Sequence, residues 1–205
     1  MPLYKKIKIN KGEFVLIWHI SETKQELLNT LKQDSSFHSK LNSIKSEVKQ
    51  IEFLSVLNLL EKQNLSFEDI HYDLNGKPSL KDRFISITHS FNYSGIFISN
   101  NKVGIDIEKF RNQILNISMK FISNQEHDVF DIKSVESLTK AWTIKESVFK
   151  AFGHSGIDFK KNIKIQSLKN DKALVVINKN EILEQYSVDL FTISNYICSL
   201  AKIIK

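Results

Sequence analysis

The sequence contains one cysteine among 205 residues, so no disulfide can form within the chain. No apolar run approaches the roughly 18 residues that a membrane span requires. Residues 1–6 lack the apolar stretch of a secretory signal. There is also no low-complexity segment and no long linker. These absences predict a cytoplasmic protein that does not enter a membrane.

The composition is that of a globular protein with a basic balance. Hydrophobic residues make up 41% of the chain and charged residues 25%, and the formal net charge is +6. A positive chain favours anionic partners such as phosphates, nucleic acid or an acidic protein surface. The six histidines include no H-x-x-x-H pair, so a zinc site of that type is not indicated.

Apolar periodicity predicts an α+β fold built as a pseudo-two-fold duplication of two similar halves, residues 1–100 and 101–205. Each half should hold a small, largely antiparallel sheet and one long helix. In the first half we expect a strand over 13–20, a helix with Ser21 as its N-cap, a helix over 44–63, and strands over 84–88 and 93–99 after a turn at 75–78. In the second we expect a strand over 103–108, a helical pattern over 117–130, a helix over 135–152, and strands over 162–167, 173–178, 186–191 and 195–203.

The strand over 103–108 alternates apolar and acidic residues at period two. Val103, Ile105 and Ile107 should point into a core, while Asp106 and Glu108 project together from the other face. Two carboxylates that close repel each other and need a cation, a proton or open water. Gly104 would let something approach the backbone closely. The alternative is an edge strand whose acidic face is solvated.

The helix over 135–152 supplies a third acid. Glu146 falls beside the apolar stripe of Trp142 and Phe149 and should be partly buried. Lys150 lies one turn further on, and the simplest explanation of that pair is an ordinary i,i+4 ion pair. Lys145 flanks the stripe from its other side. Three carboxylates without a Cys/His cluster suit Mg²⁺, which shares its coordination with substrate phosphates.

Four motifs in this order resemble the 4′-phosphopantetheinyl transferases of the surfactin-synthetase type. They are Gly76-Lys77-Pro78, Ile85-Ser86-Ile87-Thr88-His89-Ser90, Val103-Gly104-Ile105-Asp106-Ile107-Glu108, and Trp142-Thr143-Ile144-Lys145-Glu146-Ser147 followed by Lys150. The resemblance covers residues 75–153, and the flanks match only in outline.

The resemblance implies an enzyme that transfers 4′-phosphopantetheine from coenzyme A to a serine of an acyl or peptidyl carrier protein, releasing adenosine 3′,5′-bisphosphate. It also implies a monomeric pseudo-dimer with coenzyme A between the halves, and partners that include neither nucleic acid nor membrane. Residues 1–100 would contribute to coenzyme A binding, and residues 101–205 would hold the metal site and the catalytic helix. The implied metal ligands are Asp106, Glu108 and Glu146; the catalytic residues Glu146, Lys150 and Asp106; and the coenzyme A contacts Lys77, Pro78, Thr88, His89, Ser90, Lys145 and Lys150. Glu146 is the candidate acceptor of the serine proton, and Glu126 matches a further acidic position.

The sequence departs from that family in its first half. Family members often carry an arginine on the first long helix, whereas no arginine occurs here between Met1 and Asp82. Lysine, a poorer bidentate partner, must therefore supply any phosphate contact. Lys40, Lys45 and Lys49 either form a solvated face or contact a bound anion. Thr88 stands where serine is usual.

Two other functions stay open at this point. Another Mg²⁺-dependent phosphoryl-transfer or phosphodiester-cleaving enzyme could use the same three acids and lysine. A basic binding module without catalysis is the second, although the lysines are scattered and show no aromatic-and-basic repeat.

Overall fold

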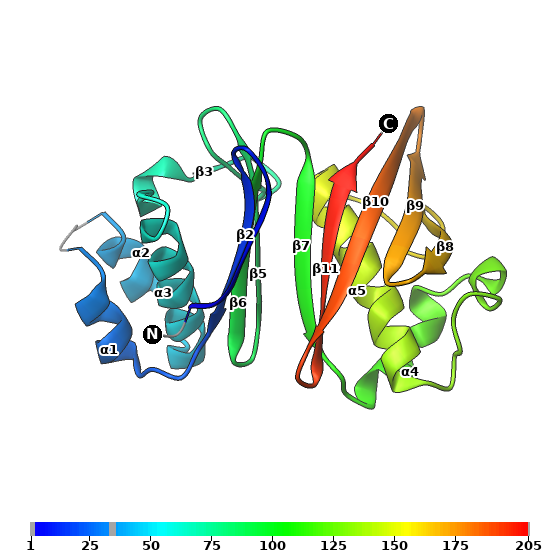
Figure 1. Ribbon diagram of the computed structural model, residues 1–205, viewed down its shortest axis with the longest axis horizontal. Coiled ribbons are helices and arrows are strands. Elements are labelled where there is room, and N and C mark those ends of the chain that lie inside the picture. The colour runs from blue at the N-terminus through cyan, green and yellow to red at the C-terminus, as the bar shows by residue number, and fades with distance from the viewer. Residues whose placement is uncertain (1–2, 33–35, 205) are drawn as a thin grey trace. The chain divides into compact units, whose positions relative to one another are not determined.

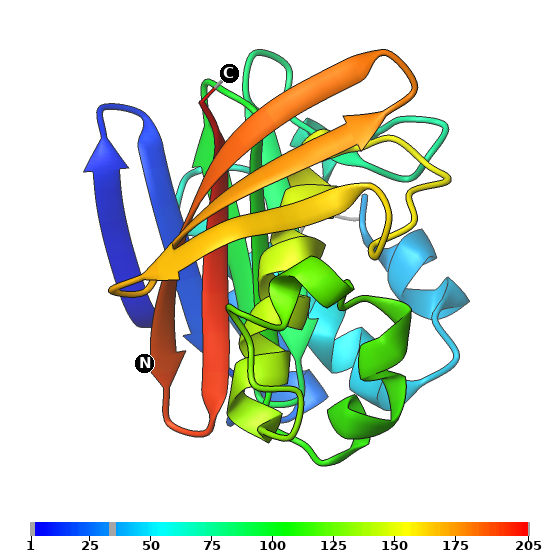
Figure 2. The same ribbon diagram turned by 90° about the vertical axis from the view of Figure 1, so that its right-hand side faces the viewer.

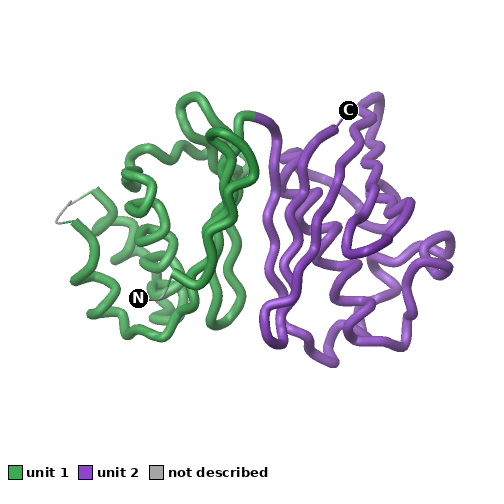
Figure 3. The backbone as a smooth tube through the Cα atoms, in the orientation of Figure 1, with its two compact units in different colours: residues 1–100 green, residues 101–205 purple. Residues whose placement is uncertain are grey.

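The structure is a computed structural model that describes residues 3–32 and 36–204. It divides into two compact units, residues 1–100 and 101–205 (Figure 3). Each unit has one sheet in which every pair of neighbouring strands is antiparallel. The predicted α+β class is therefore confirmed. Among the described residues, no helix has the length and apolar character needed to cross a membrane.

Unit 1 contains a six-stranded sheet with helices against one face (Figure 1). Its strand order is β1-β2-β6-β5-β4-β3. The strands are β1 (Leu3–Asn10), β2 (Glu13–His19), β3 (His71–Tyr72), β4 (Pro78–Ser79), β5 (Phe84–Ser90) and β6 (Tyr93–Ser99). The helices are α1 (Lys24–Thr30), α2 (His38–Ser43) and α3 (Glu47–Glu61), with a 3₁₀ turn at Phe67–Asp69. Leucine and isoleucine side chains from α3, β2, β5 and β6 form its core.

Two local predictions for unit 1 were wrong. The N-cap of α1 is Thr23 and not Ser21, because Thr23 and Glu26 form a reciprocal capping box that Ser21 cannot make. The helix predicted over 44–63 is shorter, since α3 spans Glu47–Glu61, and its apolar residue Val48 is 61% exposed. Glu52, one turn further along, is buried instead.

Unit 2 contains a five-stranded sheet in the order β7-β11-β10-β9-β8. Figure 2 shows α5 lying against one face of this sheet. The strands are β7 (Val103–Lys109), β8 (Ile163–Lys169), β9 (Lys172–Lys179), β10 (Ile182–Ile193) and β11 (Tyr196–Ile203). The helices are α4 (Gln113–Ile117) and α5 (Val135–Phe152). Helix α5 ends at Phe152, as predicted, and is followed by Gly153, whose left-handed φ of 76° suits glycine.

The helical pattern predicted over 117–130 is not a helix. Only short 3₁₀ turns form there, at Ser118–Lys120 and Asn124–Glu126. Ser123 and Glu126 form a capping box, but the turn it opens stops after three residues. Because the Glu126 carboxylate also accepts from Ile165 N on β8, the segment is held to the sheet and not extended along a helix axis.

The topology of the two units is consistent with the duplication predicted from the sequence. In unit 1 the chain runs β2, α3, β3, β4, β5, β6, and the sheet order is β2-β6-β5-β4-β3. In unit 2 it runs β7, α5, β8, β9, β10, β11, and the sheet order is β7-β11-β10-β9-β8. The two series correspond in five strands and one long helix, whereas β1, α1 and α2 of unit 1 and α4 of unit 2 stand outside this correspondence.

Candidate active site

Strand β7 presents its acidic face to α5. A Cβ atom on Gly104 would lie 1.8 Å from the carbonyl oxygen of Ser147, so glycine is required where this strand meets the helix. By the alternation of side chains, Asp106 and Glu108 project toward the same helix. The predicted close approach at Gly104 is thus made by α5. The edge-strand alternative was right in one respect, because β7 is an edge strand of its sheet. Its acidic face is not solvated, however, since Asp106 is only 4% exposed.

The two β7 carboxylates each contact a side chain of α5. Lys150 Nζ donates to Asp106 Oδ1 at 2.7 Å and to the carbonyl of Ile105 at 3.1 Å. Trp142 Nε1 donates to Glu108 Oε1 at 3.3 Å. Glu146, partly buried as predicted, lies on α5 between these two donors in sequence. The structure therefore brings together the second-unit acids and Lys150, which the sequence singled out.

Electrostatics show that the three acids share one environment. Burial, and next to it the Asp106 charge, raises the pKa of Glu108 to about 7. Burial and the Asp106 charge also raise the pKa of Glu146 to about 7, against the opposing effect of Lys150. Lys150, together with Arg111 near Glu108, does not outweigh burial and the charge of Asp106, so the pKa values of Glu108 and Glu146 stay raised.

The donor set fits a hard divalent cation in its chemistry, since it offers only carboxylate oxygens. Within residues 3–32 and 36–204, however, no three His, Cys, Asp or Glu side chains already lie close enough together to hold a metal ion. The predicted ligands Asp106, Glu108 and Glu146 would have to move together around a cation. A cation that displaced the protons from Glu108 and Glu146 would offset the repulsion that helps to raise their pKa values.

The equivalent positions of unit 1 carry no acid. Asp106 pairs with the fourth residue of β11, and Glu108 pairs with the second. The residues of β2 that pair with the fourth and second residues of β6 are Leu16 and Trp18. Both are buried in the core of unit 1. The two corresponding strands therefore differ in role: β2 packs in the core of unit 1, whereas β7 carries the acidic cluster of unit 2.

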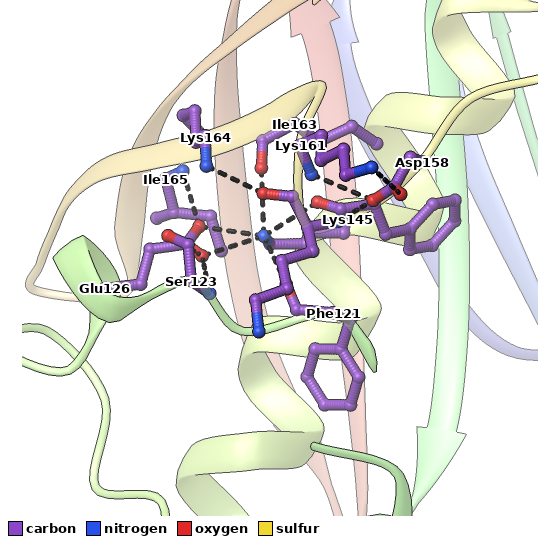
Figure 4. A network of polar contacts seen from close by, with 11 residues as sticks. Phe121, Ser123, Glu126, Lys145, Asp158, Lys161, Ile163, Lys164 and Ile165 are labelled. Atoms are coloured by element: carbon purple, nitrogen blue, oxygen red, sulfur yellow. Dashed lines mark hydrogen bonds and ion pairs between the residues drawn. The ribbon is translucent and has the colours of Figure 1, made fainter. Parts of the chain in front are cut away.

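The position of Lys145 disagrees with the coenzyme A contact that the resemblance implied for it. Its side chain is 0% exposed. Figure 4 shows its ammonium group enclosed by acceptors. It donates to Glu126 Oε2 at 2.9 Å and to the carbonyls of Phe121 (2.7 Å), Phe159 (3.0 Å) and Ile163 (2.9 Å). Because these four acceptors surround its three N–H groups, Lys145 has none left for a phosphate.

Glu126, whose role the sequence left open, is the counterion of Lys145. Its carboxylate also accepts from Ser123 N at 2.8 Å and Ile165 N at 2.9 Å. Burial raises the pKa of Glu126, but the Ile165 amide and the Lys145 ammonium outweigh that effect and hold it below its ordinary value. Glu126 and Lys145 thus tie the 118–126 segment, α5 and β8 into one core (Figure 4).

Lys77 and Pro78, the first of the predicted contacts in unit 1, lie at the turn into β4. Asp73 organises this turn by accepting from Asn75 N at 2.8 Å and Lys77 N at 2.9 Å. Gly76 adopts a φ of 78°, which suits glycine. Pro78 pairs with Tyr72 on β3. The Lys77 side chain is partly exposed.

Thr88, His89 and Ser90 are the last residues of β5, and alternation places them on two faces. Thr88 and Ser90 are buried, whereas the His89 side chain is 44% exposed. His89 faces α3, and its Nδ1 lies 3.3 Å from Glu52 Oε2. One ligand group could therefore meet all three side chains only at the C-terminal end of the strand.

Two cavities adjoin these residues. One, of about 420 Å³, lies wholly in unit 1 between α3, the 67–72 segment and the end of β5, with His89, Glu52, Lys40 and Lys49 among its lining residues. The other, of about 220 Å³, lies in unit 2 beside the acidic cluster and is lined by Glu108, Arg111, Trp142 and residues of α4.

Arg111 and Glu52 are the charged residues of these sites that sequence reasoning missed. The Arg111 charge lowers the pKa of Glu108, against the larger effect of burial. In the sequence, Arg111 could have been identified by its position three residues after Glu108. For Glu52 the signal was an acid on an otherwise apolar helix, one turn before Val56.

Comparisons with known proteins find one matching family model and several similar proteins. Residues 102–201, nearly the whole of unit 2, match the family model of the 4′-phosphopantetheinyl transferase superfamily. The 4′-phosphopantetheinyl transferase gsp of Aneurinibacillus migulanus is 31% identical over 151 residues, which are 71% of this chain and 61% of that protein. The 4′-phosphopantetheinyl transferase Sfp of Bacillus subtilis (strain 168) is 30% identical over 98 residues, 46% of this chain and 44% of the other.

A second 4′-phosphopantetheinyl transferase of Bacillus subtilis is 29% identical over 98 residues, again 46% of this chain and 44% of that protein. The chain thus spans between 44% and 61% of the length of these relatives. The matched segment contains β7 and α5, which carry the acidic cluster and Lys150. Residues 102–201, just under half of the chain, are thus similar to the 4′-phosphopantetheinyl transferase superfamily.

Proposed function

We propose that the protein transfers the 4′-phosphopantetheine group of coenzyme A to a serine of an acyl or peptidyl carrier protein. The serine oxygen bonds to the β-phosphorus, the bond from that phosphorus to the bridging oxygen breaks, and adenosine 3′,5′-bisphosphate leaves. The observation that carries this proposal is the facing of β7 and α5, which sets three carboxyl groups around one lysine. That inventory suits a metal-bound diphosphate.

We assign the second-unit residues three roles. Asp106, Glu108 and Glu146 would hold Mg²⁺, which when bound neutralises charge on the diphosphate. Lys150 would leave Asp106 to contact the phosphates and stabilise the charge that develops during transfer. Glu146 is also our candidate for accepting the serine proton, a general-base role that a positioned carboxylate can fill.

In unit 1, we propose that Lys77 and Pro78, with Thr88, His89 and Ser90, contact the 3′-phosphate and ribose end of coenzyme A. His89, the exposed member of the last three, lines the cavity of unit 1, which supports this proposal. Lys145 is not included, because its ammonium is already surrounded by internal acceptors.

We propose that the protein is a monomer that acts in the cytoplasm on an acidic carrier surface and uses neither nucleic acid nor membrane as a partner. Its net charge of +6 supports an acidic partner. Its single cysteine, Cys198, is buried and forms no disulfide, which suits a reducing compartment.

The rival function is another Mg²⁺-dependent phosphoryl transfer or phosphodiester cleavage. To separate the two, the protein is incubated with coenzyme A and Mg²⁺, with and without an apo carrier protein, and the nucleotide products are resolved by chromatography. Release of adenosine 3′,5′-bisphosphate only when the carrier is present supports the proposal. Release without the carrier, or cleavage of nucleic acid or simple phosphodiesters, supports the rival.

A further inference from the structure

Glu52 is a buried acid on α3 at the polar end of the larger cavity. Its side chain is 7% exposed. Its Oε2 lies 2.7 Å from Lys49 Nζ and 3.3 Å from His89 Nδ1. The nearby wall of the cavity is apolar, with Phe53, Val56 and Leu57 from the same helix. A carboxylate is costly to bury and is tolerated here because it has these two partners.

The charges at this end of the cavity are limited. Lys40, Lys49, Glu52 and His89 are its ionisable lining residues apart from the phenol of Tyr72. With a neutral imidazole the sum is +1, since Glu52 cancels one of the two lysines. An anion that binds on His89 would therefore meet a carboxylate already in contact with the same ring.

We infer that Glu52 is a specificity-determining residue that lowers the preference of the protein for 3′-phosphorylated coenzyme A over 3′-dephospho-coenzyme A. The inference rests on the proposed function, in which His89 contacts the 3′-phosphate. The Glu52 carboxylate is in contact with Lys49 and His89, the cationic and polar groups that a phosphate would otherwise contact. Because 3′-dephospho-coenzyme A lacks the 3′-phosphate, the Glu52 carboxylate does not repel it in this way.

The expected size follows from Coulomb's law. A phosphomonoester carries nearly two negative charges at neutral pH. Bringing even one unit charge to about 4 Å of the Glu52 carboxylate in a water-like dielectric weakens binding about fivefold. Neutralising Glu52 should therefore raise the preference for coenzyme A at least about fivefold, with little change for the dephosphorylated substrate.

The test compares three variants of the full chain. Glu52→Gln removes the charge and keeps an acceptor for Lys49. Lys49→Gln removes the opposite charge from an exposed side chain and should shift the preference the other way. Glu47→Gln is the matched control, because Glu47 is an exposed acid in the first turn of the same helix.

Two ratios are measured for each variant. The first is kcat/KM with coenzyme A divided by kcat/KM with 3′-dephospho-coenzyme A, using an apo carrier protein. The second is the ratio of dissociation constants of adenosine 5′-monophosphate and adenosine 3′,5′-bisphosphate, measured by calorimetry, which needs no turnover. We expect both ratios to rise at least about fivefold in Glu52→Gln, to fall in Lys49→Gln and to stay constant in Glu47→Gln.

The outcomes separate this inference from the proposed function. If transfer occurs but Glu52→Gln leaves both ratios unchanged, or Glu47→Gln shifts them equally, the role of Glu52 is wrong and the function stands. If no variant transfers phosphopantetheine, the proposed function fails, and the binding ratio alone then supports or refutes the selectivity of the Glu52 site. Should Glu52→Gln fail to fold, Lys49→Gln decides by the direction of its shift.

Discussion

Replacing Lys145 by methionine should destabilise the protein severely without removing a catalytic group. The ammonium of Lys145 is fully buried and donates to Glu126 and to three backbone carbonyls. Methionine fills much of the volume but donates to none of them. Breaking a buried ion pair from one side costs about 3–5 kcal/mol, because the other charge stays buried. That is a large share of the roughly 5–15 kcal/mol that stabilises an ordinary domain.

The assay is urea unfolding followed by tryptophan fluorescence, with Lys140→Met as the matched control. Lys140 lies on the same helix and forms an i,i+4 pair with Glu136, whose side chain is 63% exposed. Losing such a pair should change the free energy of unfolding by less than about 1 kcal/mol. Adding Glu126→Gln to Lys145→Met should recover part of the loss, because the unpaired charge is then removed.

The same variant tests the two roles considered for Lys145. In conditions where Lys145→Met stays folded, we expect its KM for coenzyme A to match that of the unmodified protein. Unchanged stability together with a raised KM would refute the buried-network explanation and would favour the phosphate contact implied by the resemblance.

Other predictions concern the acidic cluster and its support. Asp106→Ala and Glu146→Gln should each abolish transfer while leaving the circular dichroism spectrum intact, because each removes a proposed metal ligand; near-normal turnover at saturating Mg²⁺ would contradict the assigned roles. Since the pKa values of Glu108 and Glu146 are raised to about 7, the stability they contribute is full below about pH 4.5 and is lost as pH rises through 7. Without metal, the free energy of unfolding should thus fall by about 1 kcal/mol per carboxyl between pH 6 and pH 8, and Glu146→Gln should remove one of these contributions; a flat profile in urea titrations would argue against the shared environment. Gly104→Ala should cost about 3 kcal/mol or more, since its Cβ would meet the Ser147 carbonyl at 1.8 Å; wild-type stability in urea would show that β7 and α5 can separate freely.

The sequence predicted elements with a strong period well. Helix α5 was bounded correctly by its apolar stripe and by Gly153, and β6 by the change from apolar residues to Asn100. The helical pattern predicted over 117–130 was wrong, because the apolar residues of this segment are buried by contacts with distant parts of the chain and do not form one face of a helix. Phe121, for example, is held where its carbonyl accepts from Lys145.

The acids of the candidate site were identified from local spacing, whereas the two lysines could be separated only by the structure. Lys145 and Lys150 lie five residues apart on one helix, and both were predicted to contact coenzyme A. The fold buries the first among carbonyls of segments distant in sequence and directs the second to Asp106. Side-chain periodicity states which face a lysine occupies, but not which acceptors the rest of the chain brings to it.

The most direct test of the central claim is the intact mass of an apo carrier protein after incubation with this protein, coenzyme A and Mg²⁺. Carriers of fatty-acid, polyketide and peptide synthesis are run in parallel, each with a chelator control and with Asp106→Ala. We expect at least one carrier to gain one phosphopantetheine group on its serine, and expect the gain to disappear with the chelator and with the variant. No gain on any carrier, or a gain that survives both controls, would contradict the claim that β7 and α5 form a metal-dependent transferase site.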